Sequence, residues 1–130
     1  MREILFRGKV KNTNEWQYGD LRHWTKKSVG IHHQELHTTL RVIPETVGQY
    51  TGLTDKNGTK IFEGDIVKIE LYHPKGFANY EIGYIKYDDT KSRFIFCTNE
   101  GEYSYDNSDV FTVIGNIHDN PELIESEDNK

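Results

Sequence analysis

The stretch that decides the fold is residues 49–72, QYTGLTDKNGTKIFEGDIVKIELY. Near its end, from Val67 to Leu71, apolar and charged side chains alternate. Successive strand residues point to opposite sides, so Val67, Ile69 and Leu71 would face a core while the residues between them face water. The pattern predicts an antiparallel strand with one buried face.

Two chain reversals precede this strand. Residues 54–58 contain an Asn-Gly pair, which tolerates the positive φ that tight hairpin turns require. Residues 63–65, EGD, predict a sharp bend after a short strand at residues 60–62. We interpret the glycines as conformational and the acidic and amide side chains as caps of their own turns. This structural turn motif consists of Gly52, Asp55, Asn57, Gly58, Gly64 and Asp65.

Period-two patterning continues on both sides of this stretch and predicts a mainly β protein. We expect an N-terminal β-hairpin region and, in the C-terminal half, a small antiparallel barrel of SH3-like size. The main expected strands are residues 4–11, 15–24, 30–39, 80–88, 92–98 and 110–118, with one helical turn at 120–124. Pro44, Gly48 and Gly52 mark residues 44–52 as the boundary region. The expected organisation is an N-terminal β region at 1–48, a barrel region at 49–125 and a disordered tail at 126–130.

Charge is unevenly distributed along the 130 residues, whose net charge is -5. Residues 1–60 hold 10 Lys and Arg against 6 Asp and Glu, a net of +4; residues 61–130 hold 6 against 15, a net of -9. The split is either an accident of composition on solvated faces or a sign of complementarity between subunits. The acidic total disfavours general binding to nucleic acid.

One cysteine, Cys97, lies in the apolar run at residues 94–97. A single cysteine cannot form an intrachain disulfide, and its apolar neighbours would bury the thiol and raise its pKa, which disfavours a catalytic role. Residues 1–7 lack the apolar core of a secretory signal, and no stretch is apolar enough to span a membrane. We therefore expect a cytoplasmic protein without membrane contact.

Residues 49–67 resemble the signature of the YopX family of phage and prophage proteins. The resemblance is supported by FRG at 6–8 with WQYGD at 16–20, and by VIGNIHDNPEL at 113–123. It implies a small protein encoded in phages or prophages of Gram-positive bacteria, of Bacillus type, that forms homo-oligomers. It implies no established activity and no catalytic residue.

The one dense group of metal-capable side chains is GIHHQELH at residues 30–37. On a strand His33, Glu35 and His37 would share a face and resemble a two-His, one-carboxylate set; on a helix only the two histidines would meet. The order differs from His-Glu-x-x-His, and one strand rarely supplies every ligand, so surface histidines are favoured. If His32, His33 and His37 lie near a symmetry axis, assembly would be sensitive to pH. A metal or ligand pair of Glu63 and Asp65 is a weaker alternative.

Catalytic and cofactor motifs are missing from the sequence. It has no Gly-x-Ser-x-Gly elbow, Walker A loop or Gly-x-Gly-x-x-Gly fingerprint. Asp88 and Asp89 are adjacent at an expected hairpin tip, where neighbouring side chains diverge. We therefore predict no catalytic residue and no cofactor.

A basic and aromatic segment at residues 22–27 is the candidate nucleic-acid site. Its residues are Arg22, His23, Trp24, Lys26 and Lys27. We expect Trp16 and Trp24 to belong instead to a core or interface. The favoured function is a non-enzymatic accessory module that self-assembles or binds a phage or host protein. The alternatives are a single-stranded nucleic-acid-binding barrel and a metal-binding enzyme using His33, Glu35 and His37.

Overall fold

The computed structural model describes residues 3–72, 78–98, 101–103 and 111–125. The chain forms two compact units, Met1–Gly52 and Leu53–Lys130, each built on antiparallel strands. The division falls after Gly52, at the end of the stretch expected to hold the boundary. The prediction of a mainly β protein is confirmed.

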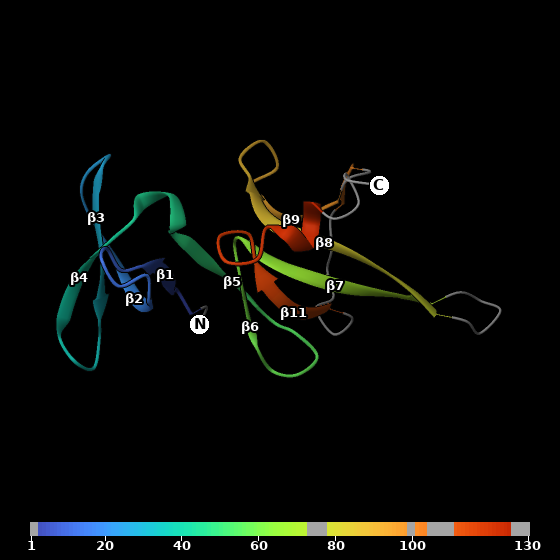
Figure 1. The fold of residues 1–130 in the computed structure, drawn as a ribbon, viewed down its shortest axis with the longest axis horizontal. Helices are drawn as coiled ribbons and strands as arrows, with labels where there is room; N and C mark the ends of the chain where they lie inside the picture. Colours follow the sequence, from blue (N-terminus) through green and yellow to red (C-terminus); the bar gives the residue numbers. More distant parts are fainter. Residues whose placement is uncertain (1–2, 73–77, 99–100, 104–110, 126–130) are drawn as a thin grey trace. The chain divides into compact units, whose positions relative to one another are not determined.

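The first unit contains a curled antiparallel sheet, and a single 3-10 turn lies between the last two of its strands in the chain (Figure 1). Its elements are β1 (Phe6–Lys9), β2 (Trp16–Thr25), β3 (Ser28–His33), β4 (Thr38–Val42), η1 (Pro44–Thr46) and β5 (Gly48–Thr54). The strand order is β4-β3-β2-β1-β5, and the end of β5 pairs with β6 (Lys60–Phe62). The curl brings β4 back to β1, where Val10 bridges Val42 and the Ile43 N–H donates to the Lys9 carbonyl at 2.8 Å.

The core of the first unit lies on one side of this sheet. Val29, Ile31 and Val42 are buried there, and alternate residues of the other strands pack against them. These partly buried partners are Phe6, Val10, Leu21 and Val47. The residues between them in each strand therefore face the opposite side.

The expected strand at residues 30–39 is wrong in one respect. β3 ends at His33, residues 34–37 form a turn, and β4 begins at Thr38. His37 has a φ of 52°, in the left-handed region that turns use. The sequence does not reveal this turn, because residues 34–37 are polar and contain no glycine or proline.

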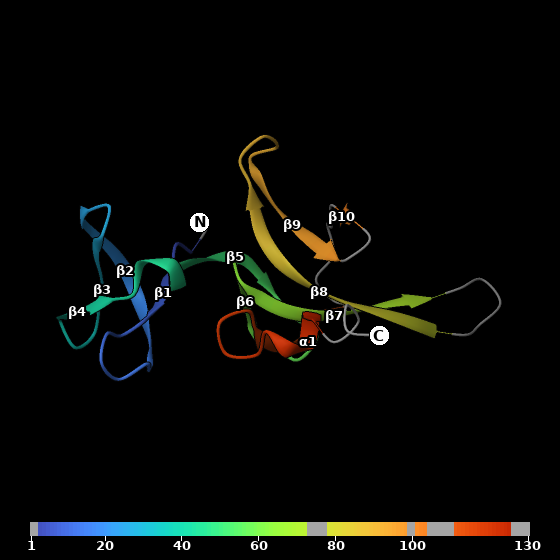
Figure 2. The ribbon, with the colours of Figure 1, turned by 45° about the horizontal axis from the view of Figure 1, so that its top comes forward.

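The second unit is a five-stranded antiparallel sheet in the order β10-β9-β8-β7-β11 (Figure 2). Its strands are β7 (Asp65–Tyr72), β8 (Ala78–Asp88), β9 (Arg93–Thr98), β10 (Gly101–Tyr103) and β11 (Phe111–Asn116). Figure 2 shows β7 and β8 as a long curved ribbon, and their register runs from Ile66 opposite Tyr84 to Tyr72 opposite Ala78.

The predicted closed barrel is not confirmed. Over the described part of the second unit the sheet is open, with β10 and β11 at its two edges. β6, which could have extended this sheet, turns back and pairs with β5 instead. Strand-forming patterns predict the strands themselves but not the partner that a three-residue strand selects.

The hydrophobic cluster of the second unit lies on one face of its sheet, while the fully buried Ile66 and Ile95 lie at alternate positions, on the other face. Phe96 and Phe111 pack with ring centroids 5.7 Å apart, and Ile61 from β6 joins the same cluster. Val67 is fully buried and Ile69 packs against the cluster, as the alternation in β7 predicts. The other members are Ile85, Phe94 and Val113.

The chain after β11 makes a turn and then the short helix α1 (Glu122–Glu125). Pro121 precedes the helix, close to the predicted helical turn. The predicted tail at 126–130 lies outside the described residues. No helix in the described ranges is both long and apolar enough to cross a membrane.

Candidate functional site

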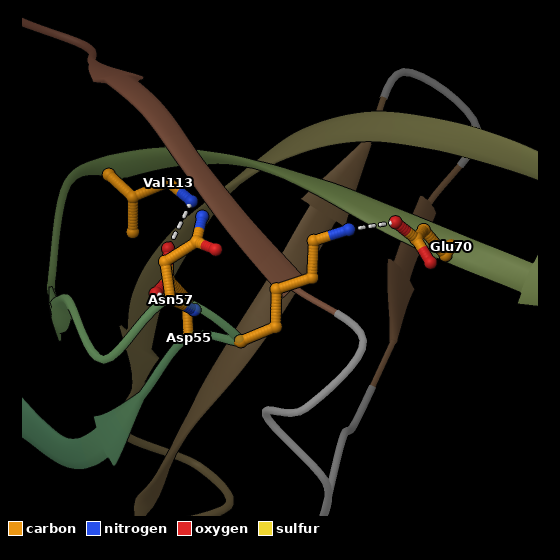
Figure 3. A network of polar contacts seen from close by, with 5 residues as sticks. Asp55, Asn57, Glu70 and Val113 are labelled. Atoms are coloured by element: carbon orange, nitrogen blue, oxygen red, sulfur yellow. Dashed lines mark hydrogen bonds and ion pairs between the residues drawn. The ribbon is translucent and has the colours of Figure 1, made fainter.

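The first turn of the structural turn motif, at residues 54–58, is organised by the carboxylate of Asp55, which is 5% exposed; Figure 3 shows its bond to Val113. One oxygen accepts hydrogen bonds from the backbone N–H groups of Asn57 and Thr59, both at 2.9 Å. The other accepts the N–H of Val113, also at 2.9 Å, from a strand 58 residues away in sequence. Asp55 therefore closes its own turn and also fastens that turn to β11.

Burial alone would raise the pKa of Asp55, because it penalises the charged form. The hydrogen bonds from Val113, Thr59 and Asn57 outweigh this penalty and hold the pKa below its ordinary value. The neighbouring Lys56 adds a smaller contribution in the same direction and forms an ion pair with Glu70. The carboxylate is thus ionised and fully engaged in structure at neutral pH.

The second bend of the motif depends on Gly64 and Asp65. Gly64 has a φ of 92°, which favours glycine, and its N–H donates to the Ile85 carbonyl at 2.7 Å. The buried Asp65 carboxylate accepts the Phe62 N–H at 2.7 Å. Gly52 and Gly58 also have positive φ values, of 90° and 85°. The positive φ values and the backbone hydrogen bonds give this motif a structural role. The Asp65 carboxylate, which with Glu63 is the weaker candidate ligand pair, bonds the backbone of its own bend.

The proposed metal set does not lie on one strand. His33 ends β3, whereas Glu35 and His37 lie in the turn that follows. The His33 Nδ1 accepts the Leu36 N–H at 3.1 Å, and the rings of His32 and His37 have centroids 6.2 Å apart. Among the described residues no group of three His, Cys, Asp or Glu side chains is placed to hold a metal ion. The continuous strand that the weaker two-His, one-carboxylate alternative requires is interrupted, because residues 34–37 form a turn.

The prediction for Cys97 is confirmed. The residue is 3% exposed, and burial raises the pKa of its thiol. Asp88 lies at the β8–β9 turn and accepts the Thr90 N–H at 2.9 Å. Neither side chain is presented as a reactive group.

The first unit has a polar outer face, the side of its sheet opposite the core. Cross-strand pairing places Arg22 and Arg41 on either side of Gly30. Trp24 is the residue of β2 at which the register with β3 shifts, between His23 and Thr25. We call Arg22, Trp24, Gly30 and Arg41 the Trp24 cluster.

Trp24 is presented to solvent rather than packed in a core. It is 53% exposed, and a Cβ on Gly30 would lie 2.9 Å from its ring, so the indole rests over the space that glycine leaves. The Arg41 guanidinium lies 5.4 Å from the ring centroid, within the range of a cation–π contact. The expectation of a core ring is therefore wrong, and an interface ring stays a prediction.

The predicted nucleic-acid residues are Arg22 and Trp24, which belong to this cluster, and Lys26 and Lys27, which follow it in the chain. Arg22 is exposed on β2, and the exposed Lys26 and Lys27 form the β2–β3 turn. Arg41 was missed in the sequence, although its alternation with Leu40 and Val42 is the signal that places it on this face.

A second group, the Trp16 cluster, lies further along the same side of the sheet. Register pairs Arg7 with Tyr18 and Lys9 with Trp16. The Arg7 guanidinium lies 4.6 Å from the Trp16 centroid and the Lys9 ammonium 5.7 Å from it. Arg7 is only 6% exposed, so this cluster is more enclosed than the Trp24 cluster.

A shallow pocket of about 220 Å³ opens near the β3–β4 turn. Its lining residues are Leu5, Tyr18, Gly19, His33, Gln34 and Glu35. All of them belong to the first unit.

Comparison with known proteins finds one family model and a similar solved structure, each matching most of the chain. The family model described as YopX protein matches residues 5–125. A crystal structure of protein EF1440 from Enterococcus faecalis is similar, with a TM-score of 0.60 and 25% identity over 96% of this chain and 100% of that chain. No curated protein matches the chain significantly.

Proposed function

Because the chain belongs to the YopX family, whose model spans both units, we propose that it is a non-enzymatic accessory protein of a phage or prophage. It acts in the cytoplasm of the bacterial host by binding protein, and its first partner is a second copy of itself. The Trp24 cluster is the contact surface, and the exposed indole at its centre is the observation that carries the proposal.

The charge of the two units supports pairing between copies. Residues 1–52 contain eight Lys and Arg against five Asp and Glu, a net charge of +3; residues 53–130 contain eight against sixteen, a net of -8. Exposed carboxylates of the second unit include Asp89, Asp119 and Glu122. A basic face on one copy and an acidic unit on another are complementary, which favours association of unlike surfaces.

The chemistry of the Trp24 cluster also suits a protein contact. Tryptophan and arginine are the residues most enriched among those that dominate binding energy. The Trp24 ring contacts Gly30 on one strand and the Arg41 guanidinium on the next, and these contacts restrict the ring before binding. The restriction lowers the conformational entropy lost on association.

Light scattering over a salt series tests the assembly. We expect the mass at micromolar concentration to exceed that of one 15.2 kDa chain at low salt. At about 1 M salt, where the Debye length falls to about 3 Å, we expect dissociation. A single-chain mass at low salt would contradict the proposal, and an oligomer unchanged at high salt would deny it an electrostatic origin.

Single-stranded nucleic acid is the second candidate partner, because the Trp24 ring is open to stacking and lies among cations. In that case Trp24→Ala should weaken oligonucleotide binding by about 1–3 kcal/mol. The same change should cost less than about 1 kcal/mol of folding stability, since the ring is half exposed. Fluorescence titration and urea unfolding measure the two effects.

A matched control for that experiment is Tyr80→Ala, which removes another exposed ring, 58% exposed, from the acidic unit. It should leave oligonucleotide binding unchanged. Absence of binding by the unmodified protein at low salt and tens of micromolar would reject nucleic acid as the partner.

A further inference from the structure

The pocket beside the β3–β4 turn differs in chemistry from the rest of the first unit. Glu35 is the one acidic residue among those that line it. Asp20 is a second carboxylate at this site, because it accepts a hydrogen bond from the side chain of the lining residue Gln34. An acidic hollow thus lies in a unit whose net charge is positive.

Two hydrogen bonds fix the wall of this pocket. The Gln34 side-chain nitrogen donates to the Asp20 carboxylate at 2.8 Å, across 14 residues of sequence. The Leu36 N–H donates to the His33 Nδ1, which assigns the ring proton of a neutral His33 to Nε2. The turn is therefore held in shape from both sides before any ligand enters, which favours binding.

The remaining lining residues suit a cation on an apolar stem. Tyr18 is 44% exposed and lines the pocket, and aromatic rings attract ammonium and guanidinium groups. Leu5 adds an apolar surface against which methylene groups can pack. The volume of about 220 Å³ lies below the range of pockets for drug-sized ligands, which begins at about 300 Å³, and fits a single side chain.

We propose that this pocket receives one lysine or arginine side chain of a partner protein. Glu35 pairs with its charge, and Tyr18 contacts the cation through its ring. The inference rests on the proposed protein-binding function and adds to it the chemistry of one partner residue.

Backbone amide NMR with small probes tests the pocket directly. N-acetyl-lysine amide and N-acetyl-arginine amide should shift the signals of Tyr18, Gln34 and Glu35 saturably, with a dissociation constant near the millimolar range. N-acetyl-norleucine amide, which has a similar stem without charge, should not. Glu35→Gln should weaken lysine binding about threefold, and Glu35→Gln with Tyr18→Leu about tenfold.

Glu45→Gln is the matched control, since Glu45 is exposed on η1 and does not line the pocket. It should leave the shifts unchanged. Equal shifts with norleucine, or binding undiminished in the double variant with a native spectrum, would overturn the proposal. The probes need no partner, so a failed titration counts against the pocket alone, while light scattering judges the assembly separately.

Discussion

Replacing Asp55 with alanine is expected to lower the free energy of unfolding by about 3–4 kcal/mol. The change removes a charged acceptor that serves the N–H groups of Asn57, Thr59 and Val113. It leaves these donors without that acceptor where the turn meets β11, and a buried donor without a partner is costly. Urea unfolding followed by circular dichroism measures the effect.

The matched control is Asp89→Ala, which removes an exposed carboxylate at the β8–β9 turn. It should change stability by no more than about 0.5 kcal/mol. An equal small loss in both variants would show that the Asp55 hydrogen bonds contribute little. The free energy of unfolding of Asp55→Asn should lie between those of the unmodified protein and Asp55→Ala, because the amide keeps only one acceptor oxygen.

The stabilisation by Asp55 should also depend on pH. Its pKa is lowered in the folded state, so its contribution is complete above the pKa of the unfolded chain. It is lost as the pH falls through the folded value, below about pH 4. The stability difference between the unmodified protein and Asp55→Ala should therefore shrink in acid and stay constant from pH 6 to pH 8.

In the turn motif the local features can be predicted from the sequence, and the contact with a distant strand cannot. The Asn-Gly pair predicts the hairpin, and an aspartate before it predicts a cap, because both effects act within a few residues. The bond from Val113 could not be predicted, since it depends on which strand lies beside the turn after folding. The same limit applies to β6, whose existence is predictable and whose partner is not.

The candidate sites also combine residues that are close in sequence with residues that only the pairing of strands brings together. The segment at residues 22–27 can be identified in the sequence because its basic and aromatic residues lie close together in the chain: Arg22, Trp24, Lys26 and Lys27. The structure adds Arg41, which comes from another strand. Sequence reasoning leaves two structural places for Trp24, a core or an interface, because large rings are common in both. The structure shows that it is 53% exposed, with its ring close to Gly30.

Reversing the two arginines of the Trp24 cluster tests the contact surface. Arg22→Glu with Arg41→Glu is expected to weaken self-association at low salt by at least about tenfold, because like charges then meet across the contact. Both side chains are exposed, so folding stability should change little. Sedimentation velocity over a concentration series measures the shift.

Lys11→Glu with Lys91→Glu is the appropriate control, because it changes the net charge equally at two exposed positions outside the cluster. Assembly that survives in the control but not in the arginine variant would locate the contact at the Trp24 cluster. An equal loss in both would mean that overall charge drives association. Survival in both would remove this face from the interface, since no complementary contact tolerates two reversed charges at its centre.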